Sequence, residues 1–254
     1  MSLTTKKQVI AVWLFAFSYF LTISLVGYIA NKSGSSQLPN TLSLEAGVSF
    51  AINLFVGFVP VVLFLVLFVR HFERRGSVAS SIASLGMNRS GIKRSLLWAV
   101  PFLVLLIVVI EVWAFAAQAI FGPNFLTALS RTTNIPKWYA ILTIISASFN
   151  AVMEEMLGRG YLLDRLMLSH PASMAAALPA VLGVSALGML YHIGPYFFSY
   201  QFSPLSAFYN LVIVFLSFIF VGLAYVRSRV QNISGPILFH FLLDALPFVY
   251  VLLA

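Results

Sequence analysis

Long apolar runs separated by short polar stretches dominate the sequence. A helix needs roughly 20 apolar residues to cross the hydrocarbon core of a bilayer, and seven runs reach about that length. They are Val9–Ala30, Ala46–Val69, Ser95–Phe121, Trp138–Arg159, Ala175–Tyr200, Leu205–Val226 and Gly235–Leu253. The pattern predicts an all-α, polytopic bundle of seven or eight transmembrane helices. No soluble domain interrupts it, so we expect residues 1–254 to form one membrane domain.

The composition supports a membrane protein and narrows its chemistry. The 254 residues are 61% hydrophobic and 9% charged, with a mean hydropathy of +0.98, whereas soluble domains are usually about 45–50% apolar. The absence of cysteine excludes disulfides, cysteine zinc sites and thiol nucleophiles. The net charge of +8 is better explained by membrane topology than by nucleic-acid binding, so we expect no nucleic-acid partner.

The basic residues predict the orientation of the chain. If the N-terminus is cytoplasmic, twelve basic residues lie on the cytoplasmic side and three on the outer side, in agreement with the positive-inside rule. The cytoplasmic set is Lys6, Lys7, Arg70, Arg74, Arg75, Arg89, Lys93, Arg94, Arg159, Arg165, Arg227 and Arg229, and the outer set is Lys32, Arg131 and Lys137. Seven spans would then leave the carboxyl end outside, and an eighth span would reverse only the segments after it.

Few ionisable residues lie within the apolar runs, so the presence of each one in the membrane requires an explanation. Charged residues at the bilayer centre cost at least about 2.5–3.5 kcal/mol on insertion scales, and they mark functional sites by default. The acids at membrane depth are Glu111, Glu154, Glu155 and Asp244, and the histidines are His192 and His240. Glu111 has no partner at helical spacing, so a hydrogen bond between helices is one reading of it and a functional role is the other.

Two pairs within this set are four residues apart, a spacing that places them on one helix face. Glu155 and Arg159 form the first pair, which we interpret as a structural ion pair. Glu154 lies about 100° around the helix from Glu155, which leaves it as a free carboxylate suited to general base or acid catalysis. His240 and Asp244 form the second pair, in which an aspartate can orient a histidine and fix its tautomer.

Three segments in this order resemble a known family. They are Glu-Glu-x-x-x-Arg-Gly from Glu154, a histidine at His192 on the next span, and His-x-x-x-Asp from His240. Over roughly residues 138–250 they resemble the CAAX protease and bacteriocin-processing family, which includes the type II CAAX prenyl endopeptidases. Residues 1–137 carry three spans without a matching motif.

The resemblance implies an intramembrane endopeptidase with its site between the fourth, fifth and last helices. In that case Glu154 activates a water molecule, His192, His240 and Asp244 complete the site, and Glu155 and Arg159 hold the motif helix in shape. The family commonly has an aromatic residue before the arginine and a phenylalanine four residues before the second-motif histidine, where this chain has Gly158 and Gly188. Asp244 replaces a typical asparagine, and an ionised aspartate cannot donate a hydrogen bond to an oxyanion.

Several alternatives stay open from the sequence. Metal-free catalysis is favoured over zinc held by His192, His240 and Glu154, because the chain lacks His-Glu-x-x-His. The expected partners are membrane lipids and a membrane-associated peptide or protein, with a prenylated one as an option. The expected site opens toward the cytoplasm.

Two rival functions remain. The protein could be a non-catalytic scaffold or bacteriocin-immunity protein, or a Glu/His proton-relay transporter. The sequence does not determine the oligomeric state.

Depth in the membrane provides a check on the shared site. Helices rise about 1.5 Å per residue, so a fifth span that began at Ala175 would place His192 far from Glu154. We therefore predict that 166–179 lies along the inner membrane interface and that the crossing begins near Ala180, because Pro171 and Pro179 favour such a break. A separation of the Glu154 and His192 side chains above about 10 Å would exclude a shared site, because direct hydrogen bonds span about 3 Å.

Overall fold

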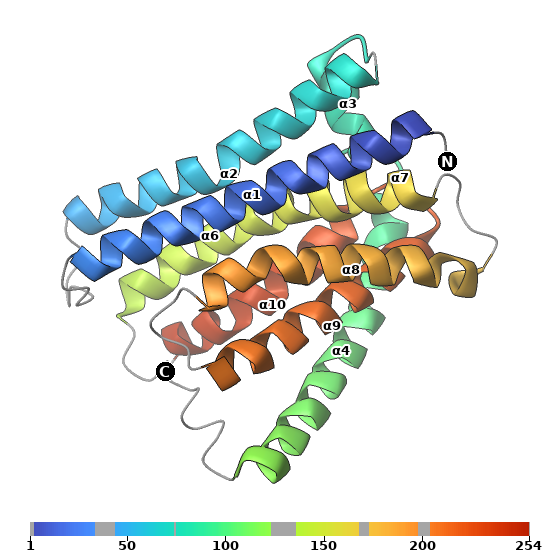
Figure 1. Cartoon of the computed structure of the whole chain (residues 1–254). Coiled ribbons are helices and arrows are strands. Elements are labelled where there is room, and N and C mark those ends of the chain that lie inside the picture. The colour runs from blue at the N-terminus through green and yellow to red at the C-terminus, as the bar shows by residue number, and fades with distance from the viewer. Residues whose placement is uncertain are drawn as a thin grey trace.

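The described part of this computed structural model is helical throughout its regular elements (Figure 1). It covers residues 3–33, 44–73, 75–122, 136–167, 173–197 and 204–253. The helices are α1 (Leu3–Ser33), α2 (Leu44–Phe72), α3 (Val78–Ser84), α4 (Ile92–Phe121), α6 (Lys137–Glu155), η2 (Met156–Leu163), α7 (Asp164–Met167), α8 (Met174–Phe197), α9 (Pro204–Ser228) and α10 (Ser234–Leu253).

Seven helices of the described residues are long and apolar enough to cross a membrane. They coincide with the seven predicted runs, which confirms the polytopic, all-α architecture. A helix satisfies its backbone hydrogen bonds internally, and lipid offers no replacement for them. The chain is therefore an integral membrane protein.

The fourth span is longer than predicted. It does not end at Arg159 but continues to Met167, over 31 residues in all, and residues Met156–Leu163 are wound as a π-helix. All eight residues of this π-helix are buried. The end of α3 packs against it closely, since a Cβ at Gly160 would clash with the backbone carbonyl of Leu85. The prediction failed because Arg159 and Asp164 read as a polar boundary, whereas both lie inside protein.

The predicted break at Pro179 is wrong. Helix α8 begins at Met174 and continues through Pro179 to Phe197, while residues 168–172 lie outside the described part of the chain. The longer fourth span removes the depth problem instead. Because that span runs to Met167, Glu154 lies near its middle, level with His192.

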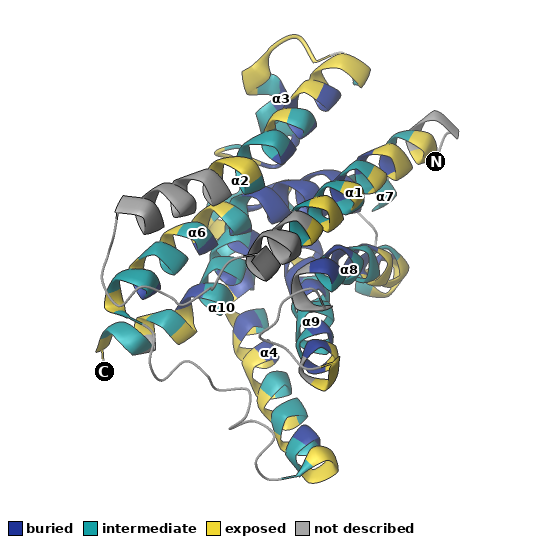
Figure 2. Cartoon of the chain, turned by 60° about the vertical axis from the view of Figure 1, so that its left-hand side comes forward, coloured by how far each residue is buried: buried dark blue, intermediate teal, exposed yellow. Residues whose placement is uncertain are grey.

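The helices meet around the end of α6. Helix α8 packs on α9, α6 packs on α10, and α4 packs on both α9 and α10 (Figure 1). Figure 2 shows buried residues where these helices meet and exposed residues on their outward faces. On α4 most of the exposed positions are apolar, including Leu97, Val104 and Phe115, as expected for a lipid-facing surface.

Candidate active site

The two adjacent glutamates lie where α6 passes into the π-helix, at the centre of the bundle. The side chain of Glu155 is 0% exposed and Glu154 is 8% exposed as a residue. Small buried residues precede them on α6, at Ala140, Ala147 and Ala151, and small residues let neighbouring helices approach closely. Two carboxylates are thereby placed inside protein rather than in lipid. π-Helical segments inside α-helices occur frequently at functional sites.

Glu155 and Arg159 form the predicted ion pair. One guanidinium nitrogen of Arg159 donates to Oε1 of Glu155 over 3.0 Å, and a second donates to the backbone carbonyl of Phe218 over 2.7 Å. The guanidinium also lies over the Phe218 ring, 4.5 Å from its centre. Both charged side chains are almost fully buried. The pair ties the motif helix to α9, which the sequence spacing alone did not indicate.

His240 connects the two glutamates. Its Nδ1 lies 2.8 Å from Oε1 of Glu155, and its Nε2 lies 3.8 Å from Oε2 of Glu154. Because Glu155 is paired with Arg159 as a carboxylate, it accepts, so Nδ1 carries the proton. Asp244, the neighbour expected from the i, i+4 spacing, lies 3.5 Å from Nε2 of the same ring, and Glu155 is a closer partner that the spacing did not indicate.

His192 reaches the same glutamate from α8. Its Nδ1 donates to the backbone carbonyl of Gly188 over 2.8 Å, since a carbonyl oxygen can only accept. Its Nε2 lies 3.6 Å from Oε2 of Glu154, well within the separation of about 10 Å that a shared site allows. In their neutral forms both histidines therefore present Nε2 lone pairs toward Glu154, and in their protonated forms they present donors.

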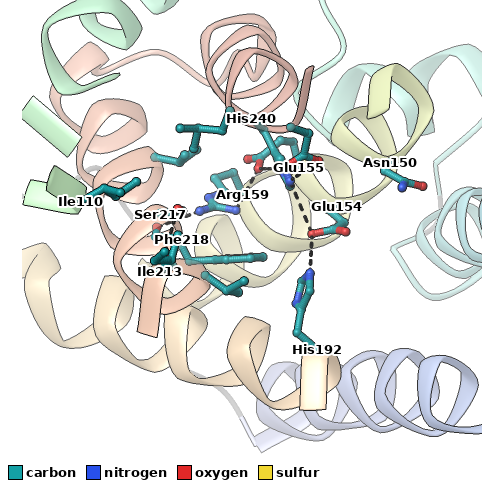
Figure 3. A pocket seen from close by; sticks show the side chains of 14 residues that line it. Ile110, Asn150, Glu154, Glu155, Arg159, His192, Ile213, Ser217, Phe218 and His240 are labelled. Atoms are coloured by element: carbon teal, nitrogen blue, oxygen red, sulfur yellow. Dashed lines mark hydrogen bonds and ion pairs between the residues drawn. The ribbon is translucent and has the colours of Figure 1, made fainter. Parts of the chain in front are cut away.

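A cavity of about 290 Å³ contains these groups (Figure 3). Its polar lining includes every predicted site residue: Glu154, Glu155, Arg159, His192, His240 and Asp244. The prediction of a site between the fourth, fifth and last spans is confirmed as geometry. The lining also includes residues that we did not predict, namely Ile110, Asn150, Ile213, Val214, Ser217, Phe218, Val221 and Leu243.

Asn150 could have been predicted from the sequence, whereas the lining residues of α9 could not. Asn150 is a polar residue within a span, four positions before Glu154, so the i, i+4 spacing could have found it. The α9 residues carry no polar signal apart from Ser217. Glu111, by contrast, is exposed on α4 and is not among the residues that line this cavity.

Phe218 explains the two glycines at positions 158 and 188. A Cβ at Gly188 would clash with the ring of Phe218, and a Cβ at Gly158 would touch it. The ring centre is 5.8 Å from that of His192 and 6.2 Å from that of His240. An aromatic side chain from α9 thus fills the room beside both motif positions.

The histidine and carboxylate side chains of the cavity are of the types that could bind zinc. Imidazole nitrogens and carboxylates are zinc ligands, and metal-bound histidines usually donate their other N–H to a carboxylate or carbonyl, as His240 and His192 do here. Within the described residues, however, no group of three or more histidine, cysteine, aspartate or glutamate side chains is arranged to hold a metal ion. We therefore derive no step through a metal.

Comparison with protein families agrees with the motifs. Residues 136–246, which include every predicted site residue, match the family described as Type II CAAX prenyl endopeptidase Rce1-like. Comparisons with curated proteins and with solved structures found no match. Over this segment, which is less than half of the chain, the protein is similar to the Rce1-like family of CAAX proteases.

Proposed function

We propose that this protein is an intramembrane endopeptidase that hydrolyses a peptide bond in a membrane-associated peptide or protein, including a prenylated one. One observation carries the proposal: Oε2 of Glu154, Nε2 of His192 and Nε2 of His240 converge on one cavity inside the membrane spans. The family match supports the same class of reaction.

Glu154 is the proposed general base. The 3.6 and 3.8 Å gaps around its Oε2 are longer than direct hydrogen bonds and suit a bridging water molecule. That Oε2 has no hydrogen-bond partner among the described residues. A water molecule here would give one proton to Glu154 as it attacks the scissile carbonyl, and one of the two histidines, in its neutral form, would accept the other O–H and orient the water.

The remaining proton transfers use the same groups. Attack on the carbonyl carbon forms a tetrahedral intermediate with a negatively charged oxygen, which needs a positioned donor. The other histidine, protonated at Nε2 before the attack, donates to this oxygen. Glu154 then returns its proton to the leaving amine as the C–N bond breaks. The carboxylate of Asp244 cannot donate to the oxyanion, so its proposed role is to act on Nε2 of His240, 3.5 Å away.

The test uses the full-length protein purified in detergent and a fluorogenic peptide library with and without a prenyl group. We expect the wild type to cleave at least one peptide and Glu154→Gln to lose that activity while it purifies and unfolds normally. A parallel reaction with a chelator tests for a metal: cleavage that survives chelation supports the metal-free reaction, whereas loss restored by zinc supports zinc.

Other results would favour the rival functions. Biological activity unaffected by Glu154→Gln, together with no cleavage of any peptide, would support a scaffold or immunity protein. Loss of ion-coupled uptake in reconstituted vesicles would support a proton relay. Both outcomes contradict the endopeptidase.

We also propose that the N-terminus is cytoplasmic and that the cavity opens to that side. The natural absence of cysteine permits single-cysteine labelling. Gly76 is exposed, and an added side chain there meets nothing within 4 Å, so Gly76→Cys should react with an impermeant reagent from the cytoplasmic side. Lys137→Cys, at the start of the fourth span, which we place on the outer side of the membrane, should react from the outside. The reverse pattern would contradict the orientation.

A further inference from the structure

A second cavity adjoins the candidate active site. It has a volume of about 200 Å³ and lies between α6 and α10. Its lining consists of Thr143, Ser146, Ala147, Asn150, Asp244 and Phe248. Asn150 and Asp244 line both cavities, so the second cavity, which we term the α6–α10 groove, continues from the first.

The polar residues of this groove follow one face of α6. Thr143, Ser146, Asn150 and Glu154 are separated by three or four positions, and that spacing aligns side chains along a helix. They lie inside a candidate membrane span, where polar side chains usually face protein or a water-filled cavity and are paired. The stripe leads from the catalytic carboxylate toward the start of α6.

Two of these side chains have no hydrogen-bond partner in the part of the chain that the structure describes. Thr143 donates its hydroxyl proton to the carbonyl of Tyr139 over 2.8 Å. Ser146 and Asn150, although half-buried, make no hydrogen bond among the described residues. Unpaired polar groups inside a membrane protein cost free energy, so a hydroxyl and a carboxamide facing one groove indicate that a polar ligand occupies it.

We propose that the α6–α10 groove binds the substrate peptide in extended form on one side of the scissile bond. This inference rests on the proposed endopeptidase function and names a binding subsite for it. A carboxamide both donates and accepts, so Asn150 matches a backbone N–H and C=O of the substrate. The stretch from Thr143 to Glu154 covers about 16 Å of helix, which accommodates about five extended residues.

The chemistry of the two cavities favours a peptide here over a lipid chain. A hydrocarbon chain in the groove would leave Ser146 and Asn150 without hydrogen-bond partners, which is unfavourable. The apolar residues Ile110, Ile213, Val214, Val221 and Leu243 line the other cavity instead. Phe248 is the one aromatic residue in the lining of the groove, and it offers a surface for a substrate side chain.

The first test varies peptide length. Peptides that wild type cleaves are extended by one to six residues on each side of the scissile bond. We expect KM to fall with length on one side only, over about five residues, and Asn150→Leu to raise KM of the longest peptide about tenfold, as for loss of one or two hydrogen bonds. Ser146→Ala should act in the same direction and less strongly.

Ser148→Ala provides a matched control. Ser148 lies on the same helix, is exposed, and donates only to the carbonyl of Ile144. In the Ser148→Ala variant, KM should depend on peptide length as it does in the wild type. Two results would overturn the groove proposal: a KM independent of length in the wild type, or a loss of kcat that is equal for all lengths in Asn150→Leu, which would indicate delivery of water instead.

A second measurement does not depend on whether a variant folds. A photoreactive residue placed three or four positions from the scissile bond of a long peptide is cross-linked to the wild-type protein. Labels within 143–150 or on Phe248 support the groove, and labels confined to Ile110 and Ile213 contradict it. Absence of any peptide cleavage by the wild type would instead defeat the proposed function, so the two failures are distinguishable.

Discussion

The two sides of the His240 ring provide environments of opposite character. On the Nδ1 side, Glu155, Arg159 and the Phe218 carbonyl form a closed network with hydrogen bonds of 2.7 to 3.0 Å. On the Nε2 side, Asp244 and Glu154 lie 3.5 and 3.8 Å from Nε2 of His240, and His192 lies 3.6 Å from the same oxygen of Glu154. The closed side excludes solvent, whereas the side chain of Asp244 on the open side is 43% exposed.

This difference divides the short motif into residues that stabilise the site, Glu155 and Arg159, and the residue proposed to act on the substrate, Glu154. Buried charges are stabilised when they are paired and hydrogen-bonded. The closed network pairs Glu155 with Arg159 and fixes the ring of His240, although Oε2 of Glu155 and Nε of Arg159 have no hydrogen-bond partner among the described residues. The open side leaves acceptor atoms facing a cavity, where a substrate and a water molecule can reach them. The adjacent glutamates thus face different neighbours, which is the basis for the different roles proposed for them.

The largest expected effect is on catalysis at the open side. Glu154→Gln removes the base without changing the shape of the side chain, so kcat should fall about 10²- to 10⁴-fold, the usual contribution of general acid–base catalysis. Its unfolding free energy should not decrease, because Oε2 of Glu154 lacks a partner to lose. Peptide cleavage and denaturant titration in detergent measure the two quantities. Equal loss of both would contradict the division between the two sides.

The next effect is on stability at the closed side. Arg159→Met leaves Glu155 buried without its cation, so the unfolding free energy should fall by about 3–5 kcal/mol. Arg75→Met is the control, because Arg75 pairs with Glu73 at 3.8 Å while 48% exposed, and such pairs contribute about 0–1 kcal/mol. Denaturant titration of both variants provides the comparison. Similar losses for the two arginines would show that burial of the pair is unimportant.

A smaller loss of stability is expected from overpacking against the ring of Phe218, which lies close to both histidines. Gly188→Ala places a methyl group against the Phe218 ring and should cost about 1–3 kcal/mol, as overpacking does. Combining it with Phe218→Leu should recover part of that loss, with a coupling of about 0.5–3 kcal/mol. Thermal unfolding of the single and double variants measures it. Additive losses would contradict direct packing between the two positions.

The smallest effect is expected at Asp244. Asp244→Asn keeps the shape of the side chain and removes a charge that is partly exposed, so kcat/KM should change by less than about tenfold, or 1.4 kcal/mol. Steady-state cleavage of one peptide by the variant and the wild type provides the measurement. A loss as large as that of Glu154→Gln would move Asp244 from a supporting to an essential role.

The sequence predicted the spans and the members of the site more accurately than their contacts. Six ionisable residues were expected to share a site, and all six line one cavity. Asp244 does lie beside His240, as its spacing predicted, but the shorter contact of His240 is with Glu155, which is distant in sequence and was not predicted as a partner. The end of the fourth span was also misplaced, since a buried arginine and an aspartate resemble a water-facing boundary when only their polarity is considered.

By itself, the sequence determined which segments cross the membrane and which residues share a helix face. Both depend on local properties, the length of an apolar run and the helical repeat, so Glu155 and Arg159 could be paired from spacing alone. Only the tertiary structure decided that Glu155 binds His240, 85 positions away, that Phe218 fills the space beside two glycines, and that Glu154 faces the cavity. Those contacts join different helices, and they depend on the depth and packing of each helix, which no local repeat encodes.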